Sequence, residues 1–194
     1  LGVIAPASNN SSTGRGEKNM KKVLFAIPLA LALTGCGSDI DLVKGGVMEF
    51  NQTTTLGKAL DNWKSCESRE WEEFETDNGI KVVQFTCQHK ISQYMSKAKS
   101  LLSEEEQAKA NHLDIASNIQ TFQFTINQGD TFQIDNVQDK ITWQDGTSFE
   151  DSQNPVEQLE TAYANNLNFD PTELNRMGAA QIYTVFAMIK MRAK

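Results

Sequence analysis

Apolar and polar residues alternate along the middle of the chain. Phe122, Phe124 and Ile126 are separated by threonine and glutamine, which is the pattern of a strand with one face toward a core and the other toward water. The alternation returns after a Gly-Asp turn and continues through a further aromatic strand. The pattern therefore predicts an antiparallel meander over residues 121–149.

A hairpin is predicted ahead of this meander. Asn78 and Gly79 lie between two runs of β-branched and aromatic residues, 71–76 and 80–87. An Asn-Gly pair supplies the positive φ angles that a tight turn demands. We therefore expect a hairpin over residues 70–88.

Helical spacing predicts the elements around these strands. Leu56, Ala59, Leu60 and Trp63 fall on one face of a helix that a preceding threonine can cap. In chain order, we expect a strand over 47–50, a helix over 56–63, the hairpin, helical structure through 89–120 restarting at the capping pair Ser103 and Glu106, the meander, a loop over 147–155, and helices over about 155–165 and 171–192.

These elements define an α+β fold with a C-terminal helix. Its helices pack on an antiparallel sheet formed by the hairpin 70–88 and the meander 121–149. The first strand, the first helix and the hairpin would form a β-α-β-β unit. Periodicity leaves open whether the domain 47–194 has one sheet or two subdomains, about 47–118 and 119–194.

The region before this domain has a different composition. Lys21 and Lys22 are followed by an apolar run, Val23–Leu33, which is shorter than the roughly 20 residues of a transmembrane helix. The run leads into the four residues Leu33-Thr34-Gly35-Cys36. This arrangement resembles the signal peptide and lipobox of bacterial lipoproteins, and the resemblance covers residues 20–36.

The resemblance implies that Cys36 is the lipidated residue. In that family a diacylglyceryl group is attached to the cysteine sulfur, the chain is cut between Gly35 and Cys36, and the new amine is acylated. Residues 20–35 would then be the signal peptide. An aspartate after the cysteine commonly retains enterobacterial lipoproteins in the inner membrane. Gly37 at that position implies the outer membrane, facing the periplasm, with the inner membrane as the alternative.

Residues 1–19 do not fit a leader, because a polar stretch precedes the two lysines. Our hypothesis is that Met20 is the true start. Residues 1–19 would then be an upstream mistranslation or a non-native extension.

The mature part that cleavage would leave has 159 residues, enough for a core without metals. We expect residues 36–46 to be a polar tether and residues 47–194 to be the periplasmic domain. Four of the 18 basic residues and one of the 25 acidic residues precede Cys36, so the mature part has a net charge of −10. This balance argues against nucleic acid as a partner. The N-terminal lipid would make the membrane contact.

Two cysteines remain after Cys36, and the envelope permits disulfides. We predict that Cys66 and Cys87 pair with each other. The alternatives are a reactive thiol pair or two buried reduced cysteines. Because the sequence has neither a C-x-x-C motif nor a metal-like His/Cys spacing, redox catalysis and zinc are disfavoured.

Catalytic motifs are missing from the sequence. His89 and His112 are the two histidines, and neither lies in a metal-binding helix motif. The sequence has no G-x-S-x-G, P-loop or dinucleotide fingerprint. We therefore expect no catalytic residue, no metal and no cofactor, and interpret the protein as a non-enzyme.

Without catalytic motifs, the function that we expect is binding. Our first hypothesis is that the domain binds a protein partner as an accessory of the envelope. The alternative is a small-molecule or glycan-binding lipoprotein in which Trp63, Trp71 and Trp143 line a groove, although tryptophans at these spacings are more often core residues. An envelope hydrolase is the weakest reading. The apolar stretch 185–189 of the last helix either packs on the domain, which we favour, or offers a partner surface.

Overall fold

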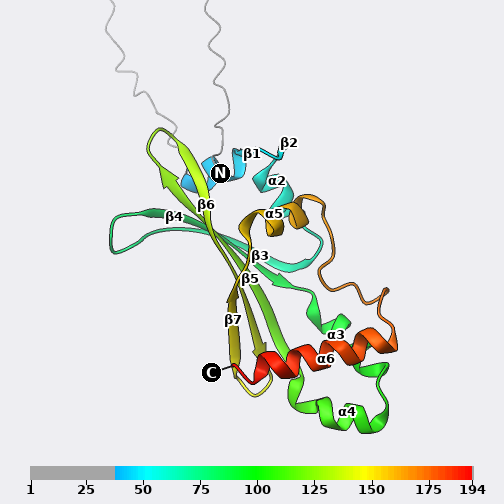
Figure 1. Ribbon diagram of the computed structural model, residues 1–194. Coiled ribbons are helices and arrows are strands. Elements are labelled where there is room, and N and C mark those ends of the chain that lie inside the picture. Colours follow the sequence, from blue (N-terminus) through cyan, green and yellow to red (C-terminus); the bar gives the residue numbers. More distant parts are fainter. Residues whose placement is uncertain (1–37, 194) are drawn as a thin grey trace, which may run out of the picture.

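The computed structural model describes residues 38–193. The signal peptide, the lipobox and the hypothesis about residues 1–19 lie outside the described residues. The described chain is built on one antiparallel sheet whose strands follow each other in chain order (Figure 1). The strands are β3 (Cys66–Glu75), β4 (Lys81–His89), β5 (Ile115–Asn127), β6 (Thr131–Trp143) and β7 (Ser148–Ser152).

The α+β prediction is confirmed, and the open question of one sheet or two subdomains is answered. The hairpin β3–β4 and the meander β5–β7 are joined because β4 pairs with β5 over residues 82–88 and 119–125. Within the predicted Asn-Gly turn, Gly79 takes a positive φ of 76° and Asn78 does not. The turn therefore needs glycine at one position only.

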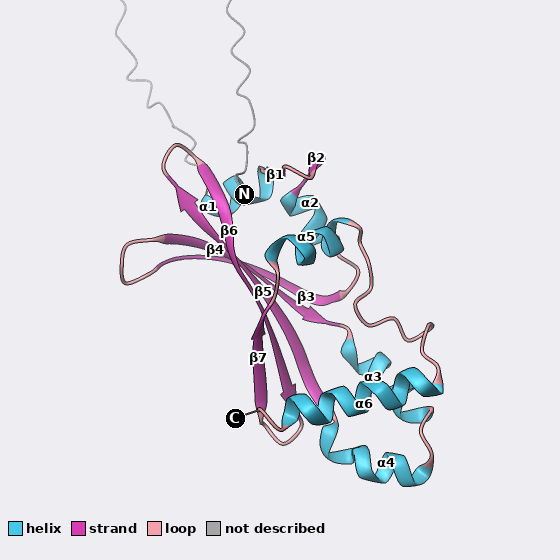
Figure 2. Ribbon diagram, viewed as in Figure 1, coloured by secondary structure: helices cyan, strands magenta, loops and turns pink. Residues whose placement is uncertain are grey.

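The helices cover one face of the sheet and leave the other face open (Figure 2). They are α2 (Leu56–Asp61) and α5 (Pro155–Tyr163) toward one end, and α3 (Ile91–Ser100), α4 (Glu104–Ala110), the 3-10 turn η1 (Asn111–Leu113) and α6 (Arg176–Lys190) toward the other. The capping box predicted at Ser103 and Glu106 is present at the start of α4.

Two separate apolar clusters fill the space between sheet and helices. The first, toward α2 and α5, includes Phe85, Phe122 and Phe124. The second, toward α3 and α6, includes Trp143 and Phe186. The five-stranded sheet of the described domain therefore has two apolar clusters on its helix-covered face.

The predicted tether over 36–46 is wrong for the part that the structure describes. Asp39–Gly45 form the helix α1, which Ser38 caps through a capping box with Asp41. Val43 is fully buried in the first cluster. The polar, glycine-bearing composition indicated a linker, but Ile40, Leu42 and Val43 together pack this short helix on the first cluster.

The predicted β-α-β-β unit is also wrong. β1 (Val47–Met48) and β2 (Asn51–Thr55) pair with each other as a small separate hairpin and do not join the main sheet. Thr55 does cap α2, as expected.

Three element boundaries differ from the prediction. Residues 115–120 are strand because β5 begins at Ile115, and its inward side chains Asn118 and Gln120 are polar, which conceals the alternation. Residues 148–152 form the edge strand β7, not a loop. α6 begins after Asn175, whose side chain accepts from the N–H of Gly178, and not at Asp170-Pro171.

Candidate functional site

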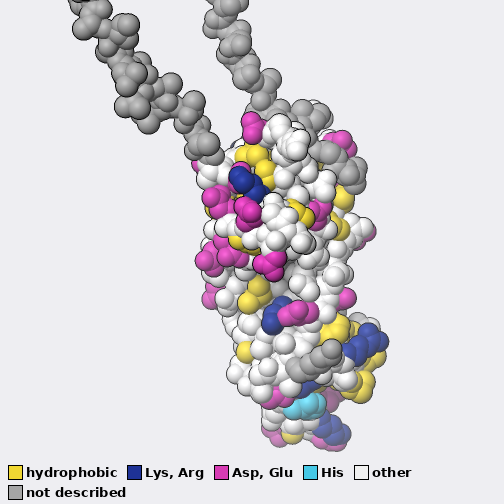
Figure 3. Space-filling view, turned by 90° about the vertical axis from the view of Figure 1, so that its left-hand side faces the viewer, with side chains coloured by type: hydrophobic (Ala, Val, Ile, Leu, Met, Phe, Trp, Pro, Cys, Tyr) yellow, Lys and Arg dark blue, Asp and Glu magenta, His cyan; other side chains and the backbone are white. Residues whose placement is uncertain are grey.

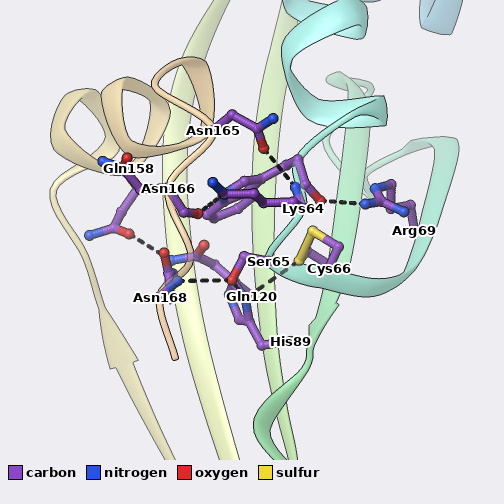
Figure 4. The surroundings of a disulfide bond; sticks show 12 residues. Lys64, Ser65, Cys66, Arg69, His89, Gln120, Gln158, Asn165, Asn166 and Asn168 are labelled. Carbon is purple, nitrogen blue, oxygen red and sulfur yellow. Dashed lines mark hydrogen bonds between the residues drawn. A yellow bond between two sulfur atoms is a disulfide. The ribbon is translucent and has the colours of Figure 1, made fainter. Parts of the chain in front are cut away.

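The predicted disulfide is present beside the first apolar cluster (Figure 4). Cys66 begins β3 and Cys87 lies in β4, and their Cα atoms are 5.3 Å apart. The bond joins two neighbouring strands. In the chain-entropy model, closing such a loop stabilises a fold by about 3 kcal/mol. The disulfide fixes the start of β3 where its register with β4 shifts.

A serine and a histidine lie together next to this bond. The Ser65 hydroxyl oxygen is 2.9 Å from His89 Nδ1 and accepts a hydrogen bond from the backbone N–H of Asn168. The two side chains have the elements of a nucleophile and its base. Ser65 and His89 are only 1% and 2% exposed, however, and the imidazole packs against Trp63 and Phe169.

Burial lowers the pKa of His89 to about 4, so the imidazole is neutral at physiological pH. Several surrounding hydrogen bonds tie the loop between α5 and α6 to the chain before β3. Trp63 Nε1 donates to the carbonyl of Asn166, and the N–H of Lys64 donates to the Asn165 side chain. The geometry of this cluster is that of a structural clasp, closed to a substrate.

The three tryptophans do not share a groove. Trp63 and Trp143 are buried in different apolar clusters. Trp71 is half-buried, packs on Phe85 and donates from Nε1 to Asp61. Burial of the first two rings leaves them no face for a ligand, as expected for core tryptophans.

The open face of the sheet carries the polar residues that motivated the glycan hypothesis. Gln84, Gln123 and Asn136 follow one another across β4, β5 and β6, and their side-chain amides are hydrogen-bonded in a row. Gln84 also donates to Glu72 on β3. Figure 3 shows the molecule from this side, with hydrophobic and acidic side chains both scattered over it among other side chains. These amides already satisfy one another.

An acidic pair lies on the helix-covered face, at the β6–β7 edge. Asp139 and Asp151 are opposite each other in the register. Burial, reinforced by the charge of Asp151, raises the pKa of Asp139 to about 6. Within residues 38–193, its Oδ1 atom is buried without a hydrogen-bond partner. Ionisation of Asp139 at neutral pH therefore lowers the free energy of unfolding.

The side of α6 turned away from the domain is exposed, and apolar residues lie on it beside the exposed Gln181 and Thr184. Met177 and Met191 are 72% and 80% exposed, and Val185 and Met188 about half exposed. The opposite side of α6 packs into the second cluster through Tyr183 and Phe186. The predicted packing is thus right for one side of the helix. The other side is exposed, and the alternative that it offers a partner surface stays a prediction.

A cavity of about 400 Å³ lies where α6 meets α4 and η1. Its wall is mainly apolar, with Leu102, Ala110, Leu113 and Ala187 contributing. His112 stands at the same wall and is exposed. The cavity shares Ala180 and Thr184 with the exposed side of α6, so the two form a continuous surface. We call this surface the α6 face.

Two classes of site are lacking from the described range. Between residues 38 and 193, no helix combines the length and hydrophobicity needed to cross a membrane. The same range contains no cluster of three or more His, Cys, Asp and Glu side chains placed to hold a metal ion.

Comparison with known families identifies the N-terminal segment. The prokaryotic membrane lipoprotein lipid attachment site matches residues 20–36. The chain is thus a bacterial lipoprotein by its attachment site, as the Leu33–Cys36 motif predicted. Neither the curated proteins nor the solved structures gave a match to the chain.

One contact in the structure was missed from the sequence: Ser65 and His89 are 24 residues apart and belong to no spacing motif. A surface on α6 was considered only as the alternative for residues 185–189. Met177, Val185 and Met188 fall on one side of a helical projection, and this is the signal that could have favoured that alternative.

Proposed function

We propose that this lipoprotein is a non-enzymatic envelope accessory whose domain binds a protein partner through the α6 face. The observation that carries the proposal is the exposed apolar side of α6, with three methionines and a valine, next to an apolar cavity. Contiguous exposed apolar surface marks protein interaction sites. Methionine is common on such surfaces because its side chain adapts to different partners.

The position of the anchor supports this assignment. A single residue lies between Cys36 and Ser38, the cap of α1. Two peptide steps span at most roughly 7 Å, so a lipid on Cys36 holds the α1 end of the domain against the bilayer. α6 lies at the opposite end of the molecule (Figure 1). The α6 face is therefore presented away from the anchoring membrane, toward a partner in the periplasm.

The clasp supports a non-enzymatic role. A hydrolase needs its nucleophile and base at a substrate cavity, whereas Ser65 and His89 are closed off by the loop that they hold. The tryptophans offer no groove for a glycan. We assign the protein to the outer membrane, facing the periplasm, from Gly37 after the acylated cysteine.

The test is site-specific photo-crosslinking in cells. A photoreactive residue at Met188 should give a discrete cross-linked species, and one at Glu160, exposed on α5, should not. Val185→Glu on the same helix should strongly reduce the Met188 product, because a buried charge is costly. Equal products from both positions, or a Met188 product insensitive to Val185→Glu, would exclude the α6 face as the binding surface.

A further inference from the structure

The edge strand β3 is unusually exposed for its length. It has ten residues, and every one from Glu67 to Glu75 is exposed except the half-buried Trp71. Edge strands of natural sheets are generally short or covered, because their free backbone groups can pair with another chain. β3 is long, and among residues 38–193 it is contacted by α1, where the Ile40 N–H donates to the Glu73 carboxylate.

The outer backbone of β3 is unpaired. Residues 68–75 pair with β4 on one side. Within residues 38–193, no backbone hydrogen bond from another element reaches residues 67–75. Since a strand directs alternate N–H and C=O groups to each side, one complete row of donors and acceptors is available along β3.

The charges of β3 select what can pair with it. Only Arg69 is basic, whereas five residues are acidic: Glu67, Glu70, Glu72, Glu73 and Glu75. The alternation of a strand distributes these carboxylates over both faces, because Trp71 points to the core through its packing on Phe85. An added strand would meet carboxylates on both of its faces.

A second copy of this chain is disfavoured as that strand. Pairing β3 with β3 would bring glutamates opposite or diagonal to glutamates, and like charges across a ladder destabilise it. Lysine or arginine at the same positions would form favourable cross-strand pairs. The charge pattern thus selects a basic, extended partner.

We propose that β3 accepts an extended segment rich in lysine or arginine, from another protein, as a sixth strand of the sheet. Main-chain hydrogen bonds supply the contact and the glutamates supply the selection, as in recognition by strand addition. The Cys66–Cys87 bond holds the start of β3 in place before the partner arrives. This site is independent of the α6 face, and either can fail without the other.

The probe is a synthetic ten-residue peptide of threonine and valine with four lysines. Its control has the same lysines, with two central neutral residues replaced by proline, which removes ladder N–H groups. Binding to the lipidated chain in neutral detergent micelles is measured by calorimetry. Hydrogen exchange read by mass spectrometry locates the protected amides.

We expect the lysine peptide to bind, to slow exchange in residues 67–75, and to lose affinity as salt is added. The triple variant Glu67→Gln/Glu70→Gln/Glu75→Gln should raise Kd at least about fivefold, since each cross-strand charge pair contributes modestly. A matched variant that removes three exposed glutamates elsewhere should change Kd by less than about twofold. Its substitutions are Glu104→Gln, Glu160→Gln and Glu173→Gln.

Four results would overturn the proposal. They are absence of binding by the lysine peptide, equal binding of the proline peptide, protection located outside residues 67–75, and self-association of the chain through a protected β3. Equal binding of the proline peptide would show that charge alone attracts the peptide. Self-association through a protected β3 would show that a second copy of the chain covers the edge.

Discussion

Replacing Asp139 by asparagine should make the protein more stable at neutral pH. Asp139 is half-buried beside Asp151, and its pKa is raised from 3.8 to about 6, first by burial and then by the neighbouring carboxylate. Asparagine has nearly the same shape without the charge. The substitution therefore removes the cost of ionising this group in the folded state.

The size of the effect follows from linkage. Between pH 3.8 and about 6 the folded state keeps the Asp139 proton and the unfolded state releases it, so stability falls as the pH rises through this window. A pKa difference of about two units corresponds to about 3 kcal/mol at neutral pH. Partial solvent access reduces this to about 1–3 kcal/mol, or roughly 3–10 °C in Tm for a domain of this size.

Thermal unfolding followed by circular dichroism at pH 7.5 and pH 3.5 tests the argument. Asp139→Asn should raise Tm at pH 7.5 and leave it almost unchanged at pH 3.5, where the wild-type carboxyl is protonated. Asp151→Asn removes only the neighbouring negative charge and leaves Asp139 buried, so it should give a smaller increase in Tm at pH 7.5. A variant that is less stable at pH 7.5, or equally shifted at both pH values, would refute the reasoning.

Four further variants have defined outcomes. Removing the disulfide with Cys66→Ala/Cys87→Ala should cost about 3 kcal/mol, seen as a lower urea midpoint. Gly57→Ala should destabilise the protein by about 1–3 kcal/mol, because the added Cβ would lie 2.9 Å from the carbonyl oxygen of Lys44 on α1. Gly45→Ala is the control, since its added Cβ would have nothing within 4 Å. In a thermal melt it should be neutral or stabilising. Burial lowers the pKa of His89 to about 4. The contribution of the neutral His89 to the free energy of unfolding is therefore fully present above pH 6.5 and is lost as the pH falls toward 4. His89→Gln should flatten this part of the stability profile, and an unchanged acid limb would contradict the assignment.

The strands that were predicted correctly are those whose inward residues are apolar. Phe122 and Phe124 alternate with polar neighbours and face the core as expected. The first half of β5 was missed because Asn118 and Gln120 are the inward residues there. β7 was missed because an edge strand with one aromatic residue has no periodic signal.

Some of the sites could likewise be predicted from the sequence, and others could not. Cys66 and Cys87 could be paired by elimination because composition and compartment left few choices. The tryptophans could not be placed, since spacing along the chain does not say which side of a sheet is covered. The exposed side of α6 and the row of free backbone groups along β3 depend on what the rest of the chain leaves uncovered. That information exists only in the packed structure.

We propose above all that the lipid-anchored domain presents the α6 face to a partner away from its own membrane. The most direct measurement is the yield of the Met188 photo-cross-link in cells, compared between the wild type and Cys36→Ala at equal expression. We predict a discrete product in the wild type and a large loss of it in Cys36→Ala, because the unanchored domain is no longer held in that orientation. An equal yield from both proteins would contradict the account.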